Sequence, residues 1–126
     1  MIRTKVTPDA HSEALDEILD ISGGKPADCM QCGKCSATCP ATKRMDILPH
    51  QAVRLLQMGQ AARVAKSGMI WQCVSCFACS ARCPRSVDPA RLFEAVRLAV
   101  ARRAGGDYLK TDEVPFLADE AMPQQA

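Results

Sequence analysis

The chain has 126 residues, which suits one domain, and only five of them are aromatic although 48% are hydrophobic. Much of that apolar share is alanine and cysteine, so a large aliphatic core is excluded. A small chain with a thin core needs an additional stabilising element, such as a disulfide or a bound metal. The formal net charge of +2 excludes the strongly basic surface typical of nucleic-acid binding.

The eight cysteines are candidates for that stabilising element, because they could form disulfides or bind zinc or iron–sulfur clusters. Disulfides need an oxidising compartment. Residues 1–6 are not followed by the apolar run of a signal peptide, and no stretch approaches the roughly 20 apolar residues that span a bilayer. We therefore expect a cytoplasmic chain without a membrane span, whose thiols stay reduced and available for metal.

A first helix is predicted to begin at Thr7-Pro8 and to end near Gly23-Gly24. Thr7 suits the N-cap and Pro8 suits the first helical position. The apolar residues that share one face of this helix are Ala14, Leu15, Ile18 and Leu19. We expect residues 1–24 to form an amino-terminal docking helix or arm.

Two blocks of four cysteines follow, from Cys29 to Pro40 and from Cys73 to Pro84. Each cysteine of the first block has a counterpart 44 positions later, and Ser36-Ala37 recurs as Ser80-Ala81. This is an internal duplication. It predicts two sites related by a pseudo-two-fold axis.

Helices are predicted between and after the blocks. One runs from Pro49 to Met58 and is ended by Gly59; a shorter one runs from Gln60 to Lys66 and stops at Gly68. Ala52, Leu55 and Leu56 form the apolar face of the first of these. A last helix starts at Asp88-Pro89, with Asp88 as N-cap, and is closed by Gly105. Its apolar stripe contains Leu92, Phe93, Val96, Ala99 and Val100.

No segment of real length alternates in the strand period of two, so the predicted fold class is all-α. Residues 25–105 are expected to form one helical domain that carries the two duplicated cysteine motifs, and residues 106–126 an extended tail. In that tail Val114-Pro115-Phe116-Leu117 lies between acidic pairs. This apolar tetrad is a candidate anchor for a larger subunit, and the alternative is a solvated tail.

Both blocks read Cys-x2-Cys-x2-Cys-x3-Cys-Pro, the run of bacterial ferredoxins whose fourth cysteine ligates the other of two clusters. Three cysteines at a spacing of three can wrap three corners of one cube, with backbone N–H groups aimed at its sulfurs. Pro40 and Pro84 turn the chain away after the fourth cysteine. By this rule one [4Fe–4S] cluster has the ligands Cys29, Cys32, Cys35 and Cys83. The other has the ligands Cys73, Cys76, Cys79 and Cys39.

Other readings of the cysteines fit less well. Zinc is usually held by two Cys-x2-4-Cys pairs per site, and thiol–disulfide catalysis by Cys-x2-Cys comes with a βαβ pattern that is missing here. His11 and His50 have no ligand-like spacing and are expected to be ordinary surface or helix residues. Ferredoxins with strands carry the same motif, but the 33 residues between Cys39 and Cys73 are predicted to form two helices.

Occupied sites would change the charge. An oxidised [4Fe–4S] core carries 2+ and its four thiolates 4−, so two sites lower the formal charge from +2 to −2. The basic residues beside the cysteines are Lys34, Lys43, Arg82 and Arg85. They either offset the cluster charge or are solvated surface residues.

The chain resembles the C subunit of heterodisulfide reductase over roughly residues 25–104. The resemblance is carried by the first cysteine block (Cys-Met-Gln-Cys-Gly-Lys-Cys-Ser-Ala-Thr-Cys-Pro), by Met45-Asp46-Ile47-Leu48-Pro49 and by Arg54-Leu55-Leu56-Gln57-Met58-Gly59. Trp71-Gln72-Cys73 through Cys83-Pro84, followed by a basic amphipathic helix, is similar to that family too.

The resemblance implies an α-helical ferredoxin with two [4Fe–4S] clusters that is a non-catalytic subunit of an oxidoreductase complex. In that family the subunit relays electrons from a flavin-containing A subunit to a B subunit, which reduces a disulfide at its own cysteine-rich iron–sulfur site. Related helical modules serve glycolate oxidase-type and anaerobic glycerol-3-phosphate dehydrogenase complexes. The alternatives to a relay subunit are a free dicluster ferredoxin and a structural or iron-sensing module.

Overall fold

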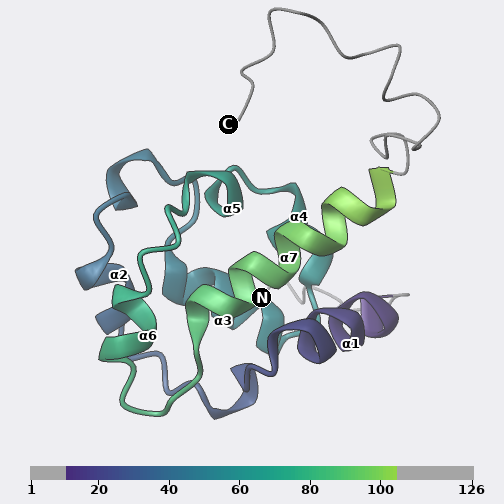
Figure 1. The fold of residues 1–126 in the computed structure, drawn as a ribbon. Coiled ribbons are helices and arrows are strands. Elements are labelled where there is room, and N and C mark those ends of the chain that lie inside the picture. The colour runs from purple at the N-terminus through teal and green to yellow at the C-terminus, as the bar shows by residue number, and fades with distance from the viewer. Residues whose placement is uncertain (1–10, 105–126) are drawn as a thin grey trace, which may run out of the picture.

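The computed structural model describes residues 11–104, with side chains from residue 13 to residue 102 (Figure 1). In this range the regular elements are α1 (His11–Ser22), η1 (Pro26–Asp28), α2 (Lys34–Thr38), η2 (Thr42–Arg44), α3 (Pro49–Gln57), α4 (Ala61–Lys66), α5 (Met69–Gln72), α6 (Ala78–Arg82) and α7 (Pro89–Ala104). No strand occurs among these residues, which confirms the predicted all-α fold.

The longer helices lie where the apolar spacing predicts them. Helix α3 starts at Pro49 and ends one residue before the predicted Met58, and α7 starts at Pro89 as expected. The predicted start of the first helix at Thr7-Pro8, the closing Gly105 and the tail at 106–126 lie outside the described residues.

Three short helices were not expected. Helices α2 and α6 lie inside the cysteine blocks, where the spacing predicts only a chain that wraps a cluster, and α5 precedes Cys73. The N–H of Gly68, at the start of α5, donates to Asp46 Oδ2 over 2.9 Å, and this bond lowers the pKa of Asp46. Met69 and Ile70 of α5 are fully buried, so core packing compensates for the short length of the helix.

Helix α7 runs through the middle of the molecule (Figure 1), and it contributes more residues to the hydrophobic core than any other described element. Phe93 is 1% exposed, and burial of such a side chain contributes about 1.5–3 kcal/mol. Helices α1, α4, α5 and α6 all contact α7. The buried residues of this core are Ile18, Ala52, Val53, Leu56, Ala61, Val64, Met69, Ile70, Val87, Leu92, Phe93, Ala95, Val96 and Ala99.

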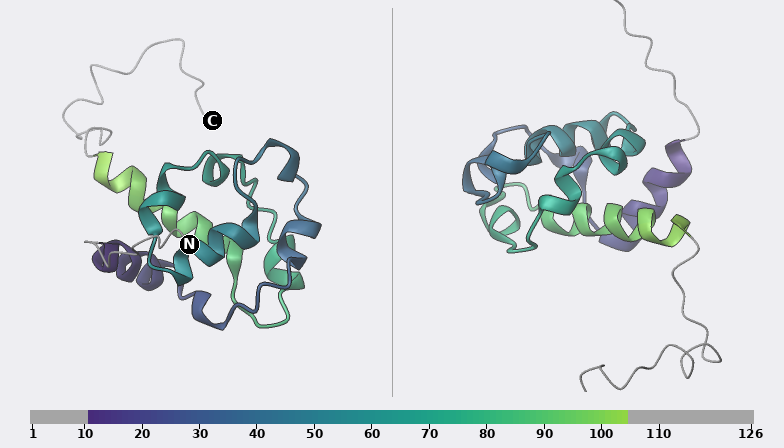
Figure 2. Two further views of the ribbon diagram at one scale, coloured as in Figure 1. Left: turned by 180° about the vertical axis from the view of Figure 1, so that it is seen from behind. Right: turned by 90° about the horizontal axis from the view of Figure 1, so that it is seen from above.

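Helix α1 lies beside α7 in both views of Figure 2 and also contacts α4. Its Ile18 is 2% exposed, and Leu15, Leu19 and Ile21 pack on the same core. The apolar face of α1 is therefore used within the domain, so α1 is part of the same packed body as the cysteine blocks.

The two cysteine blocks meet at one end of the molecule, away from α1. Helices α2 and α6 contact each other there, and Figures 1 and 2 show them side by side. Segments 44 residues apart are thereby brought together, as the duplication predicts. None of the helices in residues 11–104 combines the length and the apolar character that a bilayer-spanning segment needs.

Gly24 lies at a close approach between the segment after α1 and the core. A Cβ at this position would lie 2.8 Å from Leu92 Cγ and Cδ2 and 3.2 Å from the Val87 carbonyl oxygen. Leu92 is fully buried, so it has no free space into which to move. Gly68 differs, because a Cβ there would lie 3.7 Å from its nearest neighbour, Asp46 Oδ1.

We predict that Gly24→Ala destabilises the protein by about 1–3 kcal/mol, the usual cost of overpacking a well-packed core. The measurement is the midpoint of thermal unfolding under anaerobic conditions with the cofactors bound. Gly68→Ala is the matched control, expected to be neutral or stabilising by about 0.4–1 kcal/mol. Equal midpoints for the two variants would contradict the close approach.

Candidate metal centres

The structure gathers the eight cysteines, all within the described residues, into two pockets. Three cysteines of one block and the fourth cysteine of the other line each pocket. The first pocket contains Cys29, Cys32, Cys35 and Cys83. The second contains Cys73, Cys76, Cys79 and Cys39. These are the two groups that the spacing rule predicts, and their action as ligands stays a prediction. All eight cysteines are free of disulfides.

Left-handed backbone curls each block around its pocket. Gln31 and Ser75, 44 residues apart, have φ values of 57° and 52°, and Gly33 and Phe77 have 78° and 60°. The conformation costs roughly 1–2 kcal/mol for a residue other than glycine, and such strain clusters at functional sites. The Gln31 N–H donates to Cys29 Sγ over 3.4 Å, so a curled loop presents amides to its sulfurs.

Each pocket has an inner and an outer edge. Cys35 in α2 and Cys79 in α6 are buried and form one small apolar cluster with Ala90 of α7. Cys32 and Cys76, the second cysteines of the blocks, are exposed. The inner edges of the two pockets therefore meet inside the protein, and each outer edge reaches the surface.

Burial also affects the protonation of the inner thiols. Burial raises the pKa of the Cys35 thiol above its ordinary value, and it raises the pKa of Cys79 to about 11. Both thiols are therefore protonated at neutral pH in the cofactor-free chain. Since thiolate is the ligating form, binding of metal at these positions must release the protons.

The serine after the third cysteine anchors the helix that follows each block. The N–H of His50, at the second position of α3, donates to Ser36 Oγ over 3.1 Å, and the N–H of Ala90, at the second position of α7, donates to Ser80 Oγ over 3.2 Å. The Ser80 hydroxyl in turn donates to Asp88. Ser80 thus provides the cap contact that the sequence assigned to Asp88.

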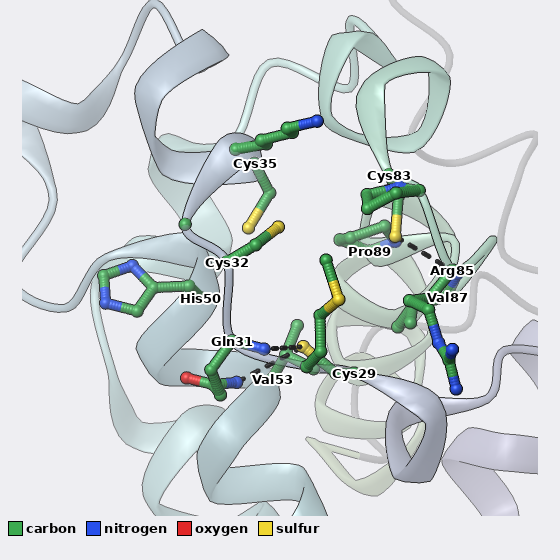
Figure 3. A pocket seen from close by; sticks show the side chains of 14 residues that line it. Cys29, Gln31, Cys32, Cys35, His50, Val53, Cys83, Arg85, Val87 and Pro89 are labelled. Carbon is green, nitrogen blue, oxygen red and sulfur yellow. Dashed lines mark hydrogen bonds between the residues drawn. The ribbon is translucent and has the colours of Figure 1, made fainter.

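His50 has a more specific place than the sequence predicted. It lines the first pocket, and its Nδ1 lies 2.7 Å from Ser36 Oγ (Figure 3 shows the residue at the pocket wall). The second block keeps the serine and the helix contact without a histidine, since Ala90 stands at that place. The shared role of the serine is therefore structural, and the histidine is specific to the first repeat.

A further pair of side chains supports the first cysteine of each block. Gln57 Nε2 donates to the Cys29 carbonyl oxygen over 2.9 Å, and Arg97 Nη1 donates to the Cys73 carbonyl oxygen over 3.2 Å. Each donor lies eight residues after the proline that begins its helix. The duplication thus continues through α3 and α7 with an offset of 40, because the link from block to helix is four residues shorter in the second repeat.

The walls of the two pockets differ. Besides its cysteines the first pocket has the basic residues Lys34 and Arg85, both exposed, whereas Met45, Phe77 and Phe93 line the second. Arg82 and Lys43 are exposed as well. The two sites therefore share their donor atoms and differ in their surroundings.

The donor set suits iron–sulfur clusters. Four cysteine thiols line each pocket, and thiolate is the usual cluster ligand. Figure 3 shows the sulfurs of Cys29, Cys32, Cys35 and Cys83 spread around a common space. No group of three or more His, Cys, Asp or Glu side chains in the described part of the chain is arranged for a single metal ion. Spread thiols fit a cubane, which is ligated at its four corners.

Comparison with known proteins agrees with this chemistry. Residues 26–87 match the family of 4Fe-4S dicluster domains. Three curated relatives match the chain as well. The chain is 39% identical over 69 residues to the C subunit of the ferredoxin:CoB-CoM heterodisulfide reductase of Methanosarcina acetivorans, an alignment that covers 55% of this chain and 28% of the relative. It is 33% identical over 88 residues to the iron-sulfur C subunit of the CoB-CoM heterodisulfide reductase of Methanopyrus kandleri, covering 70% and 43%.

The third relative is the C subunit of the H(2):CoB-CoM heterodisulfide,ferredoxin reductase of Methanothermobacter thermautotrophicus, 31% identical over 96 residues that cover 75% of this chain and 50% of the relative. The alignments thus span between about a quarter and a half of the length of these relatives. Because the matched domain includes all eight cysteines, the chain carries two [4Fe–4S] clusters, and over that domain it is similar to these heterodisulfide reductase C subunits.

Proposed function

We propose that this chain is the non-catalytic electron-transfer subunit of a cytoplasmic, heterodisulfide reductase-like complex. It relays single electrons between a flavin-containing A-type subunit and a cysteine-rich, disulfide-reducing B-type subunit. The names of the relatives support this assignment, since all three are C subunits of enzymes named for the CoB-CoM heterodisulfide.

One observation carries the proposal. The buried Cys35 and Cys79 bring the inner edges of the pockets together, while the exposed Cys32 and Cys76 bring each outer edge to the surface. This is the arrangement a relay needs, because one partner can approach each outer edge while the two sites stay close inside. If the cysteines served only to stabilise a small fold, one such site would be sufficient.

Each residue of the pockets has a proposed role. We assign Cys29, Cys32, Cys35 and Cys83 to the first cluster, and Cys73, Cys76, Cys79 and Cys39 to the second. When bound, each cluster supplies reversible one-electron chemistry, and the protein supplies position and environment. Ser36 and Ser80 fix the helices behind the pockets, and Gln57 and Arg97 fix the loops.

The organisation of the chain is part of the proposal. Residues 25–105 act as the dicluster domain, with residues 1–24 before it and the tail at 106–126 after it. Since α1 already packs on α7 through Ile18, the tail with Phe116 is the better candidate for an anchor on a partner.

The relay can be tested by purifying the chain, anaerobically and with an affinity tag, from its native source. We expect it to co-purify in fixed ratio with a flavoprotein and a cysteine-rich iron–sulfur protein. Electron transfer from the reduced flavoprotein to a disulfide should fall to background when this chain is omitted from the reassembled complex. A small free species, or partners of the glycolate oxidase or glycerol-3-phosphate dehydrogenase type, would overturn the proposal.

Crossed ligation predicts which cysteine variants behave alike. Cys39→Ala should lose the same electron paramagnetic resonance signal as Cys73→Ala, and Cys83→Ala the same signal as Cys29→Ala, with iron falling from about eight to about four per chain. All four should also unfold more readily, because metal-binding energy is folding energy in small domains. If Cys39→Ala matched Cys29→Ala instead, each block would hold its own cluster.

A further inference from the structure

Arg97 is a partly buried cation with an incomplete set of partners. Its Nη1 donates to the Cys73 carbonyl oxygen and its Nη2 to Ser75 Oγ, so the guanidinium lies against the second cysteine loop. Its Nε is buried and has no hydrogen-bond partner among the described residues. No carboxylate of the described residues forms an ion pair with it.

A desolvated positive charge without an anion is unfavourable, and proteins normally pair such a charge. The loop that Arg97 contacts through the Cys73 carbonyl lines the second metal site, which becomes an anion when a cluster is bound. Four thiolates and an oxidised [4Fe–4S] core carry a net charge of −2, and one added electron makes the site more negative. The guanidinium and the occupied site therefore have opposite charges, and their attraction grows on reduction.

The first repeat provides a natural comparison. Gln57 occupies the place of Arg97 and donates to the Cys29 carbonyl oxygen in the same way, but it is neutral. Its Oε1 accepts a bond from Arg54, which is exposed to water. The two loops thus have the same backbone support, and only the second has a partly buried charge directly behind it.

Other charges near the sites act through water. Lys34 and Arg85 line the first pocket but are exposed, and exposed charges are screened by solvent and salt. Near the second pocket, Asp88 is paired with Arg91 at 3.2 Å, which offsets its negative charge. Arg97 is the least exposed of these cations, so solvent and salt should screen its charge least.

We propose that Arg97 is a positioning residue that sets the reduction potential of the second cluster. Its charge favours the reduced form and so raises that potential, whereas Gln57 supports the first loop without such an effect. The inference rests on the ligand sets of the proposed function, and it is independent of which subunits the chain meets.

The test is a redox titration of the anaerobically prepared full chain, followed by electron paramagnetic resonance. Arg97→Gln should lower one of the two midpoint potentials by about 59 mV, which corresponds to a tenfold change in the equilibrium constant of a one-electron couple. Arg97→Lys, which keeps the charge, should restore most of that shift. Gln57→Arg should raise the other midpoint, and iron content should stay at the wild-type level.

Salt and an exposed cation provide the controls. Arg85→Gln should shift the midpoint potential of the first cluster less than Arg97→Gln shifts that of the second. The small shift should vanish at 1 M salt, where the Debye length is about 3 Å.

The inference is overturned if Arg97→Gln moves neither midpoint, if Arg97→Lys behaves like the glutamine variant, or if Gln57→Arg and Arg97→Gln move the same midpoint. If Arg97→Gln loses its clusters, the Gln57→Arg shift decides the question alone. Each of these outcomes leaves the crossed-ligand and partner experiments unaffected, so failure here is distinct from failure of the relay.

Discussion

The contact between α2 and α6 is the constraint on which both metal sites depend. Each pocket needs cysteines from both blocks, so neither is complete unless segments 44 residues apart lie side by side. The helices α3 and α7 secure that contact, because the amide at the second position of each helix is tied to the serine beside the third cysteine. The core around Phe93 then fixes α7 in place. The same contacts that fold the domain therefore also assemble the two sites.

Much of this arrangement could be predicted from the sequence. The spacing of the cysteines predicts two sites, and helical periodicity with Pro49 and Pro89 at the helix starts predicts α3 and α7. Helix α5 was missed because four residues have no periodicity to detect, and its stability comes from the burial of Met69 and Ile70. Short elements of this kind depend on tertiary packing, which no local pattern contains.

The supporting residues around the pockets were missed for a different reason. The cysteines repeat with an offset of 44, but the helices behind them repeat with an offset of 40, so Gln57 and Arg97 do not align in a simple comparison of the two halves. Aligning the two prolines would have paired these residues. Ligand spacing does not predict the place of His50, because its contact with Ser36 depends on how the start of α3 meets the cysteine block. The left-handed backbone at Phe77 was missed too, and its one signal is the alignment of Phe77 with Gly33 in the first block.

The small buried cluster of Cys35, Cys79 and Ala90 has a consequence for speed as well as for shape. Electron tunnelling slows steeply as the gap between two centres widens. Here the gap is bounded by two thiols and a methyl group, and Ala90 sits one residue past the start of α7, beside the serine contact that fixes the helix end. Ala90 is 2% exposed, so we expect a bulkier side chain there to separate the two blocks and lengthen the tunnelling path. Ala90 is therefore the expected spacer between the two sites, and we expect the rate of electron exchange between two bound clusters to depend on the size of its side chain.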